Sequence, residues 1–210
     1  MKILQRIKSG HYNRVYEVEY EGKVAIAKLK KPTTLVTTNL DVFLGNTIHG
    51  DNRSYNTPTS RHKYEKKRLR ELYQRGANVP QILYEGDGYF IMEKLPGETL
   101  DELFGHPSQY NAIIVAFAQL RVLHDELRVY HGSTHPRNVI INGRGASWVD
   151  WETLLKGGSL KSNQRRDIKI LYHDLVRKLG LSKRLQDSIE SSYPAAIPVI
   201  SNDGLTYRPA

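Results

Sequence analysis

The stretch from Tyr130 to Glu152 constrains the fold of this 210-residue chain more than any other part of the sequence. Two apolar-rich runs, at 139–141 and 147–149, flank the turn sequence NGRG, which is typical of a β-hairpin. Such a hairpin would bring Asn138 and Asp150, just outside the two runs, close together at one edge. Mg²⁺ prefers protein oxygens together with phosphate oxygens and water. The sequence therefore predicts a magnesium site for phosphoryl transfer at Asn138 and Asp150.

Two other interpretations of this stretch stay open. A hairpin that carries polar residues is also a common surface turn, because short motifs occur often by chance. His131 and His135 are four residues apart, which would suit a zinc pair on one face of a helix. Gly132 and Pro136 disfavour a helix there, and the chain has no cysteine to complete a zinc site.

The composition is that of a soluble globular protein, with 39% hydrophobic and 25% charged residues. No apolar run approaches the ~18 residues of a membrane span, and the first ten residues are too polar for a signal peptide. We therefore expect a cytoplasmic protein. The net charge of +9 favours anionic partners, such as nucleotides, nucleic acid, phosphorylated glycolipids or an anionic membrane surface, and does not choose among them.

The first thirty residues predict an antiparallel sheet of three strands, at 3–8, 14–20 and 23–29. Alternation in the third strand places Val24, Ile26 and Lys28 on one face. A lysine that points inward beside Val and Ile needs an anion. The alternative is a lysine on an edge strand that reaches water.

The next part of the chain predicts one helix and one hairpin. The helix spans 60–75 and ends at Gly76, and its notable carboxylate is Glu65, which could also be a solvated partner of Arg61. The hairpin joins 81–84 to 89–92. The polar insertion 32–60 is expected to approach the substrate.

The second half is predicted to be mainly helical, with helices at 99–104, 110–128, 165–179 and 182–191. In the second of these, apolar residues at helical spacing define a buried face that includes His124, which we expect to be a hydrogen-bonded core residue. The tail 194–210 has few apolar residues, so no order is predicted for it.

The pattern His-Gly-x-x-His-Pro-x-Asn followed by Val-Asp-Trp-Glu resembles the small atypical kinases of the RIO, aminoglycoside phosphotransferase and lipopolysaccharide-core (Kdo and heptose) kinase types. The resemblance implies an α+β, two-lobed protein-kinase-like fold. Residues 1–92 would form a β-rich lobe, 93–98 a hinge and 99–210 a helical lobe with the catalytic loop. In these families the third residue of the loop is an Asp that receives the proton of the acceptor hydroxyl, and here it is Ser133.

The same resemblance implies the remaining site residues. Asp167 would brace the catalytic loop, unless it only complements the dipole of its helix. Catalysis would involve Ser133, Asn138, Asp150 and Lys28, with Mg²⁺ on Asn138 and Asp150. Lys28, paired with Glu65, would hold the α- and β-phosphates of ATP, and the glycine turn with Gly10 and Val15 would cover the nucleotide. Ile26 would lie under the adenine, with Met92 behind the pocket. Backbone groups of Glu93 and Leu95 would face the adenine edge.

We therefore expect an ATP-dependent kinase that phosphorylates a hydroxyl of a carbohydrate, lipopolysaccharide-type or other small acceptor. The segment after Asp150 is too short for a protein-kinase activation segment, which disfavours a regulated protein kinase. Because of Ser133, a pseudokinase that binds nucleotide and acts through a partner stays open. The interpretation as a nucleic-acid-binding protein rests on the net charge alone and ranks below the kinase and the pseudokinase. Peripheral contact with the inner face of an anionic membrane also stays open.

Overall fold

The structure is a computed structural model, which describes residues 1–9, 13–31, 58–143, 145–151, 153, 158–179, 199–201 and 204–206. The chain divides into two compact units. The first unit contains Met1–Leu95 and Asp150–Gly157, and the second contains Pro96–Val149 and Gly158–Ala210. The break at Leu95 lies within the predicted hinge, whereas Asp150–Gly157 groups with the first unit although the prediction had placed it with the helical lobe. Gly10, Glu152, the insertion up to residue 57 and the predicted helix 182–191 lie outside the described residues.

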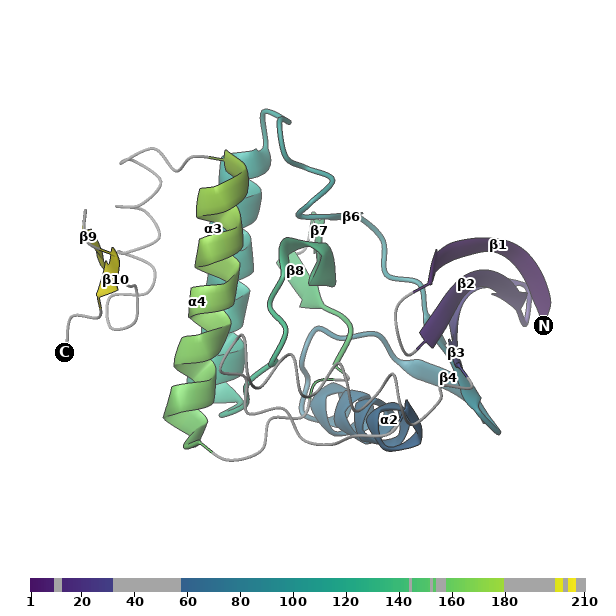
Figure 1. Ribbon diagram of the computed structural model, residues 1–210. Coiled ribbons are helices and arrows are strands. Elements are labelled where there is room, and N and C mark those ends of the chain that lie inside the picture. Colours follow the sequence, from purple (N-terminus) through teal and green to yellow (C-terminus); the bar gives the residue numbers. More distant parts are fainter. Residues whose placement is uncertain are drawn as a thin grey trace. The chain divides into compact units, whose positions relative to one another are not determined.

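The first unit is built on a five-stranded antiparallel sheet with the order β1-β2-β3-β5-β4. Figure 1 labels the strands β1 to β4 of this sheet. Its strands are β1 (Lys2–Ser9), β2 (Asn13–Tyr20), β3 (Lys23–Lys30), β4 (Ile82–Gly86) and β5 (Tyr89–Glu93). The three N-terminal strands and the later hairpin are confirmed. β5 inserts beside β3, so β3 is an interior strand, and the edge-strand interpretation of Lys28 is wrong.

The two faces of this sheet bury different side chains. On one face Val18, Ala25, Ala27 and Ile91 form a small apolar core. The other face carries Lys28, because strand residues alternate in direction, and here α2 (Pro58–Gln74) packs against the sheet. The helix ends just before Gly76, which has a positive φ of 77°, as the sequence predicted.

The second unit combines a three-stranded antiparallel sheet with two long helices. The sheet has the order β6-β7-β8, with β6 (Glu98–Thr99), β7 (Val139–Asn142) and β8 (Gly145–Trp148). The helices are α3 (Gln109–Arg121) and α4 (Leu160–Leu179), and the short turns are a π-turn, η1 (Val122–Glu126), and a 3₁₀ turn, η2 (Pro136–Asn138). In the tail, β9 (Val199–Ser201) pairs with β10 (Gly204–Thr206). None of the described helices has the length and apolarity that crossing a bilayer requires.

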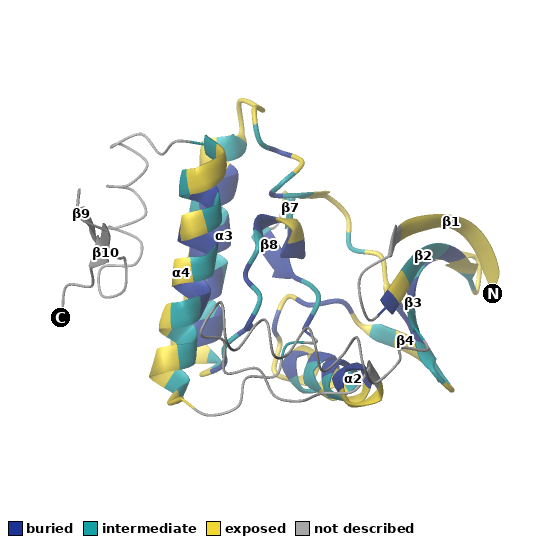
Figure 2. Ribbon diagram, in the orientation of Figure 1, coloured by how far each residue is buried: buried dark blue, intermediate teal, exposed yellow. Residues whose placement is uncertain are grey.

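The predicted face of α3 is confirmed, since the buried positions follow helical spacing and continue into His124 of η1. Figure 2 shows much of α3 in the colour of buried residues. Two boundaries and one whole helix were predicted wrongly. The helix predicted at 110–128 ends at Arg121 and continues as η1, and α4 begins at Leu160 rather than at 165. The helix predicted at 99–104 is absent, because Thr99 pairs with Ile140 of β7.

Thr99 nevertheless makes the contacts of a helix start. Its backbone N–H donates to Glu102 Oε2 at 2.7 Å, and the Glu102 N–H donates to Thr99 Oγ1 at 3.3 Å. These reciprocal bonds are those of a helix capping box. Here they close a single turn after β6, and no helix follows.

Candidate functional site

The first unit contains a buried lysine cluster of Lys28, Glu65 and Asp150. Lys28 Nζ donates to both carboxylate oxygens of Glu65 at 2.8 Å and to Asp150 Oδ1 at 2.5 Å. Lys28 is 4% exposed and Glu65 is fully buried. The predicted pairing of strand lysine and helix glutamate is therefore present, while its role in nucleotide binding stays a prediction. Two carboxylates therefore share one ammonium.

The backbone around Asp150 has an unusual conformation. Asp150 has a φ of 70°, in the left-handed region that residues other than glycine rarely adopt. Trp151, which follows, is 1% exposed, and the Arg68 guanidinium of α2 lies 5.9 Å from its ring centroid. Lys28 therefore binds Asp150 at one side, and α2 holds the next residue. Such conformations persist only where the surroundings impose them, and they cluster at functional sites.

Three of the predicted nucleotide-binding residues, Val15, Ile26 and Met92, lie on the sheet face that carries Lys28. Val15 pairs directly with Lys28 across β2 and β3, and Ile26 pairs with Met92 across β3 and β5. Directly paired residues of an antiparallel sheet point to the same side. The Glu93 N–H donates to Gln81 O at 2.9 Å, so only the Glu93 carbonyl remains for the predicted contact with the adenine edge. Leu95 is half-buried at the end of this unit.

His62 is a buried residue of this face that the sequence did not single out. It is 4% exposed, and its ring centroid lies 4.9 Å from that of Phe90 in β5. Burial, followed by the positive charges of Lys66, Lys28 and Lys30, lowers the pKa of His62 from 6.5 to about 4. At neutral pH a neutral imidazole therefore lies beside the lysine cluster.

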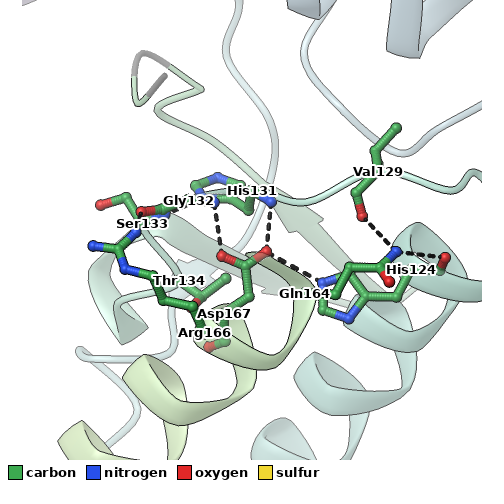
Figure 3. A network of polar contacts seen from close by, with 9 residues as sticks. All are labelled: His124, Val129, His131, Gly132, Ser133, Thr134, Gln164, Arg166 and Asp167. Atoms are coloured by element: carbon green, nitrogen blue, oxygen red, sulfur yellow. Dashed lines mark hydrogen bonds and ion pairs between the residues drawn. The ribbon is translucent and has the colours of Figure 1, made fainter. Parts of the chain in front are cut away.

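In the second unit, Asp167 of α4 anchors the loop from His131 to Asn138 (Figure 3). Its carboxylate is fully buried and accepts the backbone N–H of His131 at 2.6 Å and that of Gly132 at 2.7 Å. Thr134 Oγ1 donates to the Asp167 backbone carbonyl. The predicted bracing role of Asp167 agrees with this geometry, which involves more than the dipole of its helix.

The hydrogen bonds of His131 define its tautomer. The Ser133 N–H donates to Nδ1 at 3.2 Å, so Nδ1 is unprotonated and Nε2–H donates to Val149 O at 3.0 Å. His131 is 1% exposed, and both of its nitrogens are engaged within the protein. The zinc-pair interpretation therefore has no support at His131. No group of three or more potential His, Asp or Glu metal ligands occurs among the residues that the structure describes.

Asn138 lies at the end of this loop, just before β7. Its Nδ2 donates to Ser133 O at 2.8 Å, and the Val149 N–H donates to Asn138 O at 2.9 Å. The predicted β7–β8 hairpin is confirmed by the pairs Val139–Trp148 and Asn142–Gly145. Because the amide nitrogen is engaged with Ser133, the side-chain oxygen of Asn138 is available as an acceptor or metal ligand. That it shares a magnesium ion with Asp150 stays a prediction.

Two residues that support the loop of the second unit, Gln164 and Arg166, were missed from the sequence. Gln164 Nε2 donates to the carbonyls of His124 at 2.8 Å and Val129 at 3.2 Å, at the π-turn where the regular helical pairing is interrupted. Arg166 donates to Gly132 O at 3.1 Å. His124 is a hydrogen-bonded core residue as predicted, 3.2 Å from Asp167. No local pattern could reveal the partners of Gln164 and Arg166, which lie more than thirty residues away in the sequence.

The sequence profile of the phosphotransferase enzyme family matches residues 3–125, which is more than half of the chain. The chain belongs to this phosphotransferase family. Its fold is similar to that of WaaP, solved in complex with acyl carrier protein, with a TM-score of 0.56 and 14% identity over 90% of this chain and 77% of that chain. It is also similar to the Rio2 kinase of Chaetomium thermophilum, solved with ADP, Mg²⁺ and phosphoaspartate. For Rio2 the TM-score is 0.58 and the identity 14%, over 93% of this chain and 63% of that chain.

At 14% identity these likenesses show the fold alone. The fold of this phosphotransferase is the predicted α+β, protein-kinase-like one, with an antiparallel sheet and one helix in the N-terminal part and a mainly helical C-terminal part. No curated protein sequence matches the chain at a significant level.

Proposed function

We propose that this phosphotransferase binds ATP with Mg²⁺ and transfers the γ-phosphoryl group to a hydroxyl of a carbohydrate, lipopolysaccharide-type or other small acceptor. The observation that carries the proposal is the buried ammonium of Lys28 between Glu65 and Asp150. A buried cation of this kind is expensive to maintain for stability alone. The carboxylate oxygens of the lysine cluster are also the kind of ligand that a divalent cation prefers.

In this proposal, each residue binds or orients one part of the nucleotide. Lys28, oriented by Glu65, binds the α- and β-phosphates. Asp150 and Asn138 provide oxygen ligands for magnesium, which when bound neutralises charge on the phosphate oxygens. The nucleoside is held by Gly10, Val15, Ile26, Met92, the Glu93 carbonyl and the backbone of Leu95.

The acceptor and the location are proposed from the fold likeness to WaaP and from the net charge. WaaP, of similar fold, was solved with acyl carrier protein, and the net charge of +9 favours an anionic acceptor, such as a phosphorylated glycolipid, over a neutral one. We place the protein in the cytoplasm, with the inner face of an anionic membrane as a second location.

A second function is a pseudokinase, which binds nucleotide and acts through a partner. The observation that favours it is Ser133, which stands where the resembling kinases have the Asp that receives a proton. A serine hydroxyl is neutral and cannot take up that proton at pH 7.

Calorimetric titration with ATP, with and without Mg²⁺, tests nucleotide binding. Asp150→Asn should remove the part of the affinity that depends on Mg²⁺. Lys28→Met combined with Glu65→Leu should weaken ATP binding at least about tenfold in both conditions, because charge-assisted phosphate contacts contribute about 1.5–3 kcal/mol. Lys23→Met, at the exposed start of β3, is the matched control. Equal affinity for all four chains would refute the proposal.

Turnover then separates the two functions. Release of ADP that depends on one of a panel of sugar, glycolipid and small-alcohol acceptors supports the kinase. Binding of Mg-ATP without turnover on any acceptor supports the pseudokinase.

A further inference from the structure

His135 and Asp174 form a hydrogen-bonded pair in the second unit that the proposed function leaves unused. His135 Nδ1 lies 2.7 Å from Asp174 Oδ2, and the two side chains are 31% and 18% exposed. Asp174 lies on α4 seven residues after Asp167, which is two helical turns, so both carboxylates lie on one side of the helix. One of them binds the backbone of the His131–Asn138 loop, and the other binds the only imidazole of that loop with a partly exposed ring.

His135 lies close to Ser133 along the loop, which places the His135–Asp174 pair near the position of the missing carboxylate. The His135 N–H donates to Ser133 O at 2.9 Å, which closes a tight turn between the two residues. Two residues span at most about 7 Å of backbone, so His135 is a close neighbour of the position that lacks the usual carboxylate. Pro136 fixes the backbone directly after it, as the first residue of η2.

The hydrogen bond to Asp174 orients the imidazole for proton transfer. In the neutral tautomer whose Nδ1–H donates to the carboxylate, Nε2 carries the lone pair that accepts a proton. The carboxylate also stabilises the imidazolium that results, which is the role of the third residue in Ser-His-Asp sites.

We propose that His135, oriented by Asp174, accepts the proton of the acceptor hydroxyl and so replaces the carboxylate that Ser133 lacks. This inference rests on the proposed function. As the acceptor oxygen bonds to the γ-phosphorus, the bond from that phosphorus to the bridging oxygen breaks and ADP leaves. The hydroxyl proton moves to His135 Nε2, and the imidazolium later returns it to water. His135 is then a catalytic residue and Asp174 a positioning residue.

The test is a double-mutant cycle between positions 133 and 135, measured as ADP release from Mg-ATP with the acceptor panel and with water. His135→Asn keeps a donor near the position of Nδ1, and hence the bond to Asp174, while it removes the proton acceptor. A positioned general base typically contributes about 10²–10⁴-fold, so His135→Asn should lower transfer at least about tenfold in the parent chain. In the Ser133→Asp background, where a carboxylate is restored, the same change should cost less than about threefold.

Asp174→Asn should follow the same pattern with a smaller effect. His173→Gln, at the neighbouring exposed position of α4, is the matched control and should leave transfer unchanged in both backgrounds. A purely structural His135 would lower transfer by the same factor whether residue 133 is Ser or Asp, and that result would overturn the inference.

Calorimetric affinity for Mg-ATP is measured for every variant, so that the two proposals can fail separately. If the parent chain binds Mg-ATP but transfers phosphoryl to none of the acceptors, including water, His135 is not a working base and the inference fails, while nucleotide binding stands. If the parent chain does not bind Mg-ATP, the proposed function itself fails.

Discussion

Replacing Lys28 by methionine should destabilise the first unit strongly. The substitution keeps the length of the side chain and removes an ammonium that lies 2.8 Å from both oxygens of the fully buried Glu65. Removing one member of a buried ion pair costs about 3–5 kcal/mol, because the remaining charge stays out of water without that partner. For a chain of this size each kcal/mol corresponds to about 2–4 °C. We therefore expect the unfolding temperature to fall by roughly 6–20 °C.

The geometry also predicts an asymmetry between the two partners. Glu65→Leu should cost less than Lys28→Met, since Lys28 still donates to Asp150, whose side chain is 33% exposed and reaches water. The double variant Lys28→Met with Glu65→Leu should recover to within about 2 kcal/mol of the parent, because apolar replacement of a whole buried pair is often neutral.

The assay is urea and thermal unfolding followed by circular dichroism and by tryptophan fluorescence, with Trp151 in the first unit and Trp148 in the second, both 1% exposed. Lys23→Met on the exposed end of β3 should stay within about 0.5 kcal/mol of the parent. The reasoning is refuted if Lys28→Met is as stable as the parent, or if adding Glu65→Leu to it restores nothing.

Two further predictions concern His62 and Gly97. Burial lowers the pKa of His62 from 6.5 to about 4, so on acidification His62 is protonated in the unfolded chain at a higher pH than in the folded chain. The free energy of unfolding should therefore decrease as pH falls from about 6.5 to 4. His62→Leu should remove up to about 3 kcal/mol of this dependence, and parallel curves of unfolding free energy against pH would contradict it. Gly97 has a φ of 112°, and an added Cβ would lie 2.1 Å from Ile141 O. Gly97→Ala should therefore cost at least about 2 kcal/mol in thermal unfolding, whereas Gly143→Ala, with nothing within 4 Å of its added Cβ, should be neutral; equal effects would refute the steric argument.

The sequence by itself determined the elements whose cause is local. Alternation of apolar and polar residues predicted the strands of the first sheet. The turn at Asp87-Gly88 predicted one hairpin, and the turn NGRG predicted the other. Apolar residues at helical spacing determined the buried face of α3. Periodicity reports which side chains share a face, and it therefore also identified Lys28 as an inward-facing lysine in need of an anion.

The tertiary structure decided what depends on partners far away in the sequence. The segment predicted as a helix at 99–104 depends on such a partner, because Glu98–Thr99 pairs with β7 as the strand β6 and only a turn follows it. The Glu65 carboxylate and that of Asp150, 122 residues from Lys28, meet its ammonium only after folding. Likewise, Asp167 and Asp174 reach the His131–Asn138 loop only because α4 folds back on it. The family resemblance implied this contact for Asp167, and no pattern along the chain indicated it for Asp174.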